Sequence, residues 1–391
     1  MNAIVRNCFI TKAILLIFLS LSFVAQAKDQ NITDNKDHLL DKLGNEFVLH
    51  ASEQNYAALD KLFNLTSHAE KIAGLIFNSA RDRAGFVKGF MERIDNTSYS
   101  KGLLITTTVQ QSTFKYLGLN KNKEPVIRIS FVEGGTEYIK LITRPNSKGV
   151  LLVNDFSMAT SGNLASVQIA NTTKLLLTPS ESVLKKLLGV KQIDDKLVAN
   201  FQEVGKLRAQ GKNKEAYDLI LSFPEKLRDR KEIILLSIGL ATFFDDNLYR
   251  RDLSNLDRLY SDDPKLAFML VDHHFYEENW PKAIAAIELA KKEWADDGAL
   301  NTMLASVFYQ GEDFASAIKA SEYAIEIEPD YEDAYWIAFT VYNAAGEFEK
   351  MIRLLEILEG QFSYEFDANS FIEDPEYTGF VKSNEFKVWF K

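Results

Sequence analysis

Residues of the same kind recur at intervals of 34 positions between Pro264 and Gly360, and this period limits the fold more than any other feature. Repeats of this length typically form helix pairs, which bury their apolar faces only when neighbouring pairs stack. We therefore expect stacked helices in this half of the chain. The recurring sets are Ala283, Ala317 and Met351; Trp280, Phe314 and Phe348; and His274, Phe308 and Tyr342.

The middle copy of the repeat resembles the tetratricopeptide repeat (TPR) family. It carries small, aromatic, turn and stop residues at the positions that the family uses, namely Leu304, Ala305, Phe308, Gly311, Phe314, Ala317, Ala324 and Pro329. The resemblance implies an all-α solenoid over residues 198–361, with a capping segment at 362–391 that covers the last pair. We expect five helix pairs, the first two degenerate: 198–228, 231–263, 264–297, 298–331 and 332–361.

The resemblance also implies which side chains face the concave side of such a solenoid. These side chains are aromatic or neutral and polar, with two acids and no base, whereas family members that clamp a terminal carboxylate use basic residues there. We expect this groove to hold an apolar or basic peptide with aromatic anchors; alternatively, the aromatics fill space between adjacent pairs. The groove residues are Asp272, Phe275, Tyr276, Thr302, Ser306, Tyr309, Gln310, Asp333, Trp336, Thr340 and Asn343.

The first half of the chain predicts a separate α+β domain at residues 45–178, after a polar lead-in at 28–44. Apolar residues recur at three and four positions up to Ile94, which indicates helices. Segments 102–119, 125–144 and 149–162 are rich in Val, Ile, Thr and aromatics and are separated by turn residues, which indicates about four antiparallel strands. Residues 179–197 then form a connecting helix and linker.

Helices followed by a bent antiparallel sheet resemble the cone-shaped cystatin-like or nuclear-transport-factor-two-like fold. Enzymes of that fold place a carboxylate base in the mouth of the cone, so the resemblance implies a pocket around Glu137, Tyr138 and Asp155. Strand alternation places Asp155 on the face of Leu151 and Val153, which suits either a pocket residue or a buried hydrogen-bond acceptor. No histidine is spaced to serve as its partner, so we favour the structural role.

The sequence contains no phosphate loop, nucleophile elbow or zinc-helix motif, and we expect no catalytic residue, cofactor or metal. His273 and His274 are adjacent, and neighbours on a helix point about 100° apart, which argues against shared ligation. His274 stands at an aromatic position of its repeat, so we expect it to be packed in the core. We expect His273 to be exposed.

The first 27 residues have the pattern of a secretory signal peptide. Arg6 and Lys12 precede the apolar run 13–24, and Ala25-Gln26-Ala27 matches a cleavage site. A retained anchor is the alternative, but a span needs about 20 apolar residues. Cys8 is the only cysteine, so the mature chain has no disulfide. We expect a periplasmic or secreted protein without a stable membrane anchor, and a bacterial periplasm suits a disulfide-free exported protein best.

Charge divides the mature chain of 364 residues (391 less 27) into unlike halves. Residues 28–190 carry 20 basic and 16 acidic residues, a balance of +4, whereas residues 191–391 carry 23 and 39, a balance of −16. An acidic repeat region repels nucleic acid and anionic lipid. Its expected partner is therefore a neutral or basic protein or peptide, with homo-oligomerisation left open.

These observations favour a non-enzymatic, exported TPR protein that mediates protein–protein interaction or envelope assembly. The alternative is a small-molecule binder, or a hydrolase- or isomerase-like enzyme, in the cone-like domain, with the repeats as a docking or regulatory arm. A cavity lined by apolar groups with one or two convergent polar groups would favour the alternative, and a filled cone would count against it.

Overall fold

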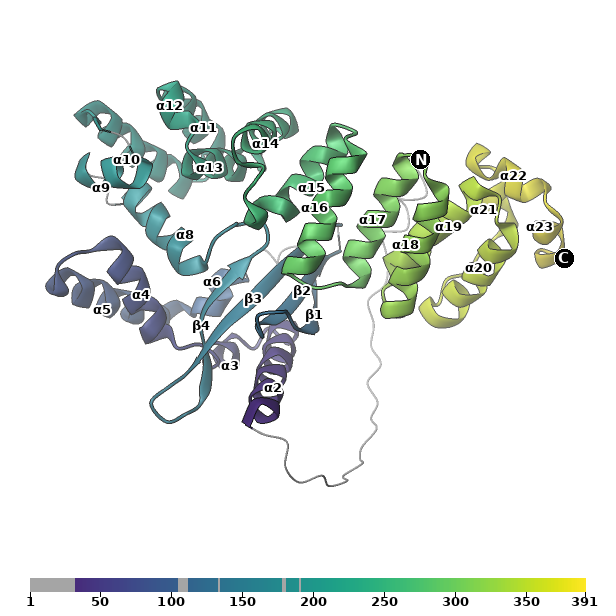
Figure 1. The fold of residues 1–391 in the computed structure, drawn as a ribbon, viewed down its shortest axis with the longest axis horizontal. Coiled ribbons are helices and arrows are strands. Elements are labelled where there is room, and N and C mark those ends of the chain that lie inside the picture. The colour runs from purple at the N-terminus through teal and green to yellow at the C-terminus, as the bar shows by residue number, and fades with distance from the viewer. Residues whose placement is uncertain (1–31, 105–111, 133, 178–180, 190) are drawn as a thin grey trace.

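The computed structural model describes residues 32–104, 112–132, 134–177, 181–189 and 191–391. It has an α+β arrangement at the N-terminal end, built on a four-stranded antiparallel sheet, and a largely helical region after it (Figure 1). The predicted signal peptide lies outside the described residues. Within the described part of the chain, no helix combines the length and the apolar character that crossing a bilayer requires.

Five helices precede the sheet in the described residues 32–104, and short polar side chains start four of them. Asn55, Asn64, Ser79 and Ser98 each accept a hydrogen bond from a backbone amide of the first turn, which satisfies a donor that the helix leaves free. The longest helix, α2, packs across β1 and β2. The helices are α2 (Ile32–Ser52), α3 (Tyr56–Asp60), α4 (Leu65–Ile76), α5 (Ala80–Thr97) and α6 (Tyr99–Leu103).

The sheet is a meander in the order β1-β2-β3-β4, and the predicted antiparallel strands and hairpins are confirmed. A bulge interrupts the last pairing, because Ile142 lies opposite Asp155 and Thr143 lies opposite Val153. The interior on the α2 side is filled by a cluster that includes Phe47, Leu59 and Ile139. The strands are β1 (Ser112–Leu119), β2 (Pro125–Phe131), β3 (Thr136–Pro145) and β4 (Leu151–Met158).

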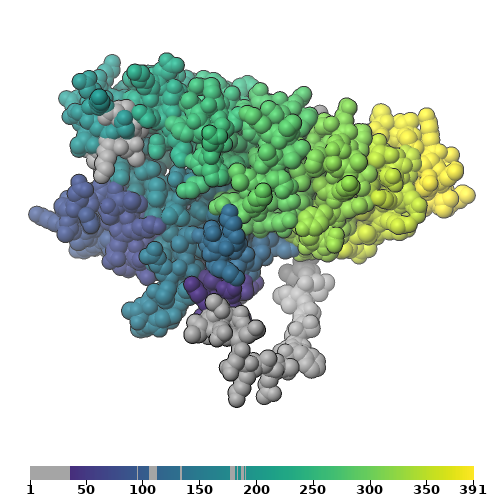
Figure 2. Space-filling view, viewed as in Figure 1, coloured from purple at the N-terminus to yellow at the C-terminus, as the bar shows by residue number. Residues whose placement is uncertain are grey.

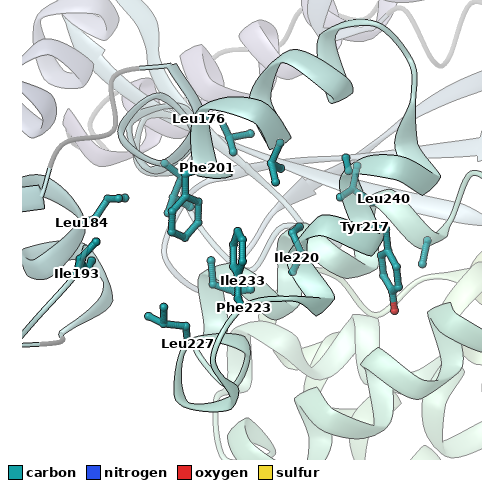
Figure 3. Packing of buried hydrophobic residues seen from close by; sticks show 14 residues of the cluster. Leu176, Leu184, Ile193, Phe201, Tyr217, Ile220, Phe223, Leu227, Ile233 and Leu240 are labelled. Carbon is teal, nitrogen blue, oxygen red and sulfur yellow. The ribbon is translucent and has the colours of Figure 1, made fainter. Parts of the chain in front are cut away.

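The helical region begins directly after the sheet, and its first core draws on residues from both sides of the predicted linker. Leu176 packs with Phe201, Phe223 and Ile233 (Figure 3). Gly205 permits this contact, because a β-carbon there would lie 2.6 Å from the carbonyl oxygen of Leu176. The elements are α8 (Ala165–Thr172), the π-helical turn η1 (Thr173–Leu177), α9 (Glu181–Leu188), α10 (Asp195–Ala209), α11 (Asn213–Leu221), α12 (Glu225–Arg228), α13 (Lys231–Ala241) and α14 (Asp246–Tyr260).

Six further helices pack in chain order, and the 34-residue spacing marks their starts. α16, α18 and α20 begin at Trp280, Phe314 and Phe348, and the residues three positions later, Ala283, Ala317 and Met351, are fully buried. The assignment to the TPR family stays a prediction. The elements are the 3₁₀ turn η2 (Pro264–Leu266), α15 (Ala267–Tyr276), α16 (Trp280–Glu293), α17 (Gly298–Gln310), α18 (Phe314–Ile327), α19 (Glu332–Ala345) and α20 (Phe348–Phe362).

The C-terminal segment packs against the last two long helices, as expected of a cap. Phe371, Phe380 and Phe386 are buried in one cluster with Phe339 and Leu355. Figure 1 shows this segment at the far end of the row of helices, beside α19 and α20. Its elements are α21 (Ala368–Ile372), the 3₁₀ turn η3 (Pro375–Tyr377), α22 (Thr378–Lys382) and α23 (Asn384–Trp389).

Candidate binding site between the sheet and the helices

A buried ionic network joins the sheet to the helical region. Arg128 of β2 is 3% exposed and donates to the carboxylate of Asp297 at 2.8 Å and to both oxygens of Glu328, at 2.8 and 2.5 Å. Asp297 caps α17, and Glu328 ends α18. Lys115 of β1 adds an ion pair to Glu328 at 2.9 Å. The two parts of the chain are therefore held together by the buried ion pairs that Arg128 forms with Asp297 and Glu328.

A second bridge lies beside this network on β3. Lys140 forms an ion pair with Glu293 and lies over the ring of Trp294, 4.4 Å from its centre. Tyr138, fully buried, donates its hydroxyl to Asp297 at 3.0 Å and packs edge-on against Phe268. Figure 2 shows the blue surface of the strands lying against the green surface of the helices.

Next to this interface lies a cavity of about 560 Å³ that both parts of the chain line. One wall comes from β2, β3, the turn after β4, and α8, and the other comes from α13, α15 and α17. Its lining is mainly apolar, with polar groups at separate points. The lining includes Phe131, Leu175, Leu235, Leu236, Phe268, Met269, Val271 and Met303, and the polar residues Thr160, Asn163, Gln168, Arg208, Glu232, Tyr249 and Asp272.

Two carboxylates reach this cavity, and neither has an ion pair within the described residues. Asp272 meets only the hydroxyl of Tyr249, which donates to it at 3.5 Å. Its side chain is exposed at the edge of the cavity, and partial desolvation there raises its pKa. Glu232, half-buried on α13, is the second carboxylate. Arg208 is exposed where it lines the cavity.

Of the eleven predicted groove residues, Asp272 alone lines this cavity. Phe275 packs edge-on against Trp280 of the next helix, with ring centres 5.7 Å apart, a contact within one predicted helix pair. Tyr276 is exposed, and the guanidinium of Arg250 lies 3.9 Å from its ring centre. The α15 stretch of the predicted groove is therefore partly open.

The predicted groove residues on α17 are half-buried and form local contacts. Ser306 donates to the carbonyl of Thr302 at 2.9 Å, and Tyr309 packs against Phe314. Gln310 also has a partner. Thr302 holds a buried hydroxyl without a hydrogen bond among the described residues.

The C-terminal segment contacts two of the predicted groove residues on α19, Trp336 and Asn343, whereas Asp333 is exposed. Trp336 packs against Tyr364 and Phe366, and Asn343 donates to the carbonyl of Glu376 at 3.1 Å. Thr340 bonds its own helix, and Asp333 accepts from Tyr331 at 3.0 Å. Trp336 is therefore not available as a groove anchor, because the cap occupies its face.

The three residues considered for a pocket in the cone are buried and packed, which for Asp155 is the structural role that the sequence favoured. Asp155, 1% exposed, accepts hydrogen bonds from Lys71 at 2.6 Å and from Ser166 at 2.5 Å, and so ties β4 to α4 and α8. Glu137 accepts from the amide of Ala159 and the hydroxyl of Thr160 and braces the turn after β4. Tyr138 belongs to the interface described above. Each side chain completes a structural network.

The sequence analysis missed a histidine beside Asp155. Nδ1 of His68 donates to the carbonyl of Asn154 at 3.1 Å and lies 3.7 Å from Asp155, and its Nε2 accepts from the hydroxyl of Tyr99 at 2.9 Å. Burial lowers the pKa of His68, so the ring stays neutral. Phe90 and Phe156 pack on the same ring. These contacts indicate a core histidine.

The adjacent histidines depart from prediction in one respect. His274 is buried as expected, but the prediction that His273 is exposed is wrong, because it is 7% exposed. Both Nε2 atoms lie 3.6 Å from the carboxylate of Asp257 on α14. The sequence argument considered a single helix and could not include the neighbouring helix, toward which both rings turn.

Of the residues that form the interface and cavity, Tyr138 and Asp272 were singled out in the sequence, but for other sites, and the remaining ones carried little signal. Arg128 reads as one polar residue in an apolar strand, and Glu328 reads as the acid before a helix-ending proline. A buried strand that contains an arginine predicts a paired carboxylate, and this was the one available indication.

A scan of protein-family models finds no match to the chain, and a search of curated proteins finds no similar sequence. The sheet, the helices and the cavity are therefore the basis for a functional proposal.

Proposed function

We propose that this chain is a non-enzymatic, exported TPR-type protein that holds a neutral or basic segment of a protein partner, and that the cavity between the sheet and α15 is its recognition site. The observation that carries the proposal is the pair of carboxylates, Asp272 and Glu232, which line an apolar cavity without an ion pair among the described residues. A carboxylate in such surroundings favours a cationic partner, because the partner's charge offsets the cost of desolvation.

The residues that line the cavity indicate which kind of partner segment would fit it. Apolar side chains of Phe268, Met269 and Leu236 suit an aliphatic or aromatic neighbour of the basic group. Arg208 repels a cation from its part of the lining, so the basic group is directed toward Asp272. The best-matched ligand is therefore a peptide in which a lysine or arginine stands beside apolar residues.

The open stretch of α15 extends the site beyond the cavity. Tyr276 lies one turn after Asp272 on the same helix and is 45% exposed. An exposed tyrosine beside a recognition cavity gives a peptide a second contact at low entropic cost. The partner's chain is expected to run from the cavity toward Tyr276. In an envelope assembly this contact would be long-lived.

The alternative is a small organic cation, and the volume of the cavity supports it. Pockets for small molecules range from about 300 to 1,000 Å³, which includes this one. The interior of the cone, where the sequence suggested a small-molecule site, is filled. In this alternative the small molecule would bind at the interface cavity.

The test uses two labelled peptides that differ at one residue, one with lysine between leucines and one with norleucine in its place. Fluorescence anisotropy with the full mature chain should show tighter binding of the lysine peptide. Asp272→Asn should weaken that peptide about tenfold or more and leave the norleucine peptide unchanged, because it removes one charged contact. Glu359→Gln, an exposed carboxylate on α20, is the matched control and should change neither.

Two results would oppose the proposal. Equal binding of both peptides by the wild-type chain would show that the carboxylates do not recognise the lysine. Displacement of the lysine peptide by an equal concentration of a small alkylamine would favour the alternative, because a peptide site needs contacts beyond the amine. A pull-down from periplasmic extract with Tyr276→Ala then measures the contribution of the outer contact.

A further inference from the structure

We propose that Asp257, His273 and His274 form a binding site for a divalent transition-metal ion of the zinc class. Asp257 lies on α14, and the two histidines lie on α15, so the ion would join neighbouring helices. The ligand atoms of the three residues lie within 4.8 Å of one another. All three side chains are buried or nearly so, with exposures of 9%, 7% and 6%.

The distances from the two imidazole nitrogens to the carboxylate are close to those between the ligand atoms of a zinc site. Zinc binds imidazole nitrogen and carboxylate oxygen at about 2.0–2.2 Å in tetrahedral geometry, which separates adjacent ligand atoms by about 3.3–3.6 Å. Nε2 of His273 lies 3.6 Å from Oδ2 of Asp257, and Nε2 of His274 lies 3.6 Å from Oδ1. The ligand atoms of all three residues lie within 4.8 Å of one another, so the rings would have to move closer together to bind one ion.

An independent observation points to a ligand at this place. Oδ1 of Asp257 is buried and has no hydrogen-bond partner within the described residues. Both imidazole nitrogens are too far from the carboxylate for a hydrogen bond. A buried acceptor without a hydrogen bond destabilises the fold. An ion between the three groups would satisfy the carboxylate and both rings together.

The donor set selects the class of ion. Two imidazoles and one carboxylate suit zinc, cobalt and nickel, whereas calcium and magnesium prefer oxygen ligands. Three protein ligands leave a fourth position for water or for an external group.

Lys282 of α16 is the built-in competitor. Its ammonium lies 3.1 Å from Oδ2 of Asp257, and its side chain is more than half exposed, so it can move into solvent when an ion enters. The lysine therefore lowers the affinity of the site without blocking it. If the site binds a metal ion, removing the charge of Lys282 should strengthen that binding. If the cluster is only an ion pair, the same change would leave the carboxylate of Asp257 unpaired and no metal would bind.

The experiment titrates the chelator-treated mature chain, purified without a histidine tag, with zinc by calorimetry and with cobalt by visible absorption. One ion per chain is expected, with the cobalt spectrum of a four-coordinate site. His273→Ala and His274→Phe should each weaken zinc binding about 10–100-fold or more, since the loss of an outer-shell partner alone has that effect. Lys282→Met should tighten it about tenfold, because it removes a nearby positive charge.

Lys292→Met is the matched control, since it removes an exposed lysine charge from the same helix outside the cluster, and it should leave the affinity unchanged. Circular dichroism confirms that each variant is folded. The proposal is overturned if neither the wild-type chain nor Lys282→Met binds zinc or cobalt, or if His273→Ala binds as tightly as wild type. These outcomes are independent of peptide binding in the cavity.

Discussion

Replacing Arg128 by methionine is the most direct test of how the sheet and the helices are held together. Methionine fills a similar volume with an apolar side chain, so the change removes the charge and its hydrogen bonds while keeping most of the packing. Asp297 and Glu328, each 5% exposed, then lose the guanidinium that neutralises them. The variant tests whether this network contributes to the free energy of unfolding or lies in the interface without stabilising it.

The expected loss in the free energy of unfolding is about 3 kcal/mol, the lower end of the 3–5 kcal/mol typical of removing one partner from a buried ion pair. The lower end applies because both carboxylates keep other partners. Glu328 retains Lys115 at 2.9 Å and the amide of Gly298 at 2.9 Å. Asp297 retains the hydroxyl of Tyr138 and the amide of Leu300, both at 3.0 Å.

Urea unfolding followed by tryptophan fluorescence measures this loss, because Trp294 lies in the interface with its ring 6.2 Å from that of Tyr138. The matched control is Lys121→Met, which removes a 3.5 Å ion pair to Glu293 from a lysine that is 59% exposed and should cost about 0–1 kcal/mol. Adding Asp297→Asn and Glu328→Gln to Arg128→Met should recover most of the loss. The reasoning is refuted if Arg128→Met costs less than about 1 kcal/mol, or if the triple variant is no more stable than the single one.

Two further outcomes follow from the same contacts. Burial opposes a low pKa at Glu293 and Glu328, but hydrogen bonds from Lys140 and Arg128 outweigh it and lower both values. Their stabilisation is therefore complete above the ordinary pKa of glutamate and is lost as the pH falls through the folded values, so urea midpoints should fall below about pH 4.5; an unchanged midpoint down to pH 3 would contradict this. A chain that ends at Gly360 lacks Phe371, Phe380 and Phe386 and should expose the apolar face of α20 and self-associate in light scattering; a stable monomer would show that the segment is not a cap.

Local patterns were sufficient to predict most of the secondary structure. The segments rich in Val, Ile, Thr and aromatics and the turn signal at Asn120 predict β1, β2 and their hairpin, and the 34-residue spacing predicts where α16, α18 and α20 begin. These signals are local, because backbone hydrogen bonding and side-chain direction depend on nearby residues.

The site depends on contacts between distant residues, and no local pattern contains them. Arg128 is 169 residues from Asp297 and 200 from Glu328, and His68 is 86 residues from Asn154. The rings of His273 and His274 meet Asp257 only because α14 packs beside α15. Helical periodicity describes one helix at a time, so it could neither place these side chains on a shared partner nor show that the C-terminal segment covers Trp336.

The opposite charges of the two halves pair with each other within the chain, which reduces the acidity that a partner would meet. Lys115, Arg128 and Lys140 of the sheet pair with Glu293, Asp297 and Glu328 of the helices, so part of the acidity of the helical half is neutralised by the chain itself. Asp272 and Glu232 are the carboxylates that line the cavity and have no ion pair among the described residues. Because the sheet is fixed in place by buried charges, the cavity keeps its shape before a ligand arrives, which lowers the ordering cost of binding. Under the proposed function, the two carboxylates of the cavity would select a basic partner, and the overall charge of the helices would contribute mainly to the rate of encounter.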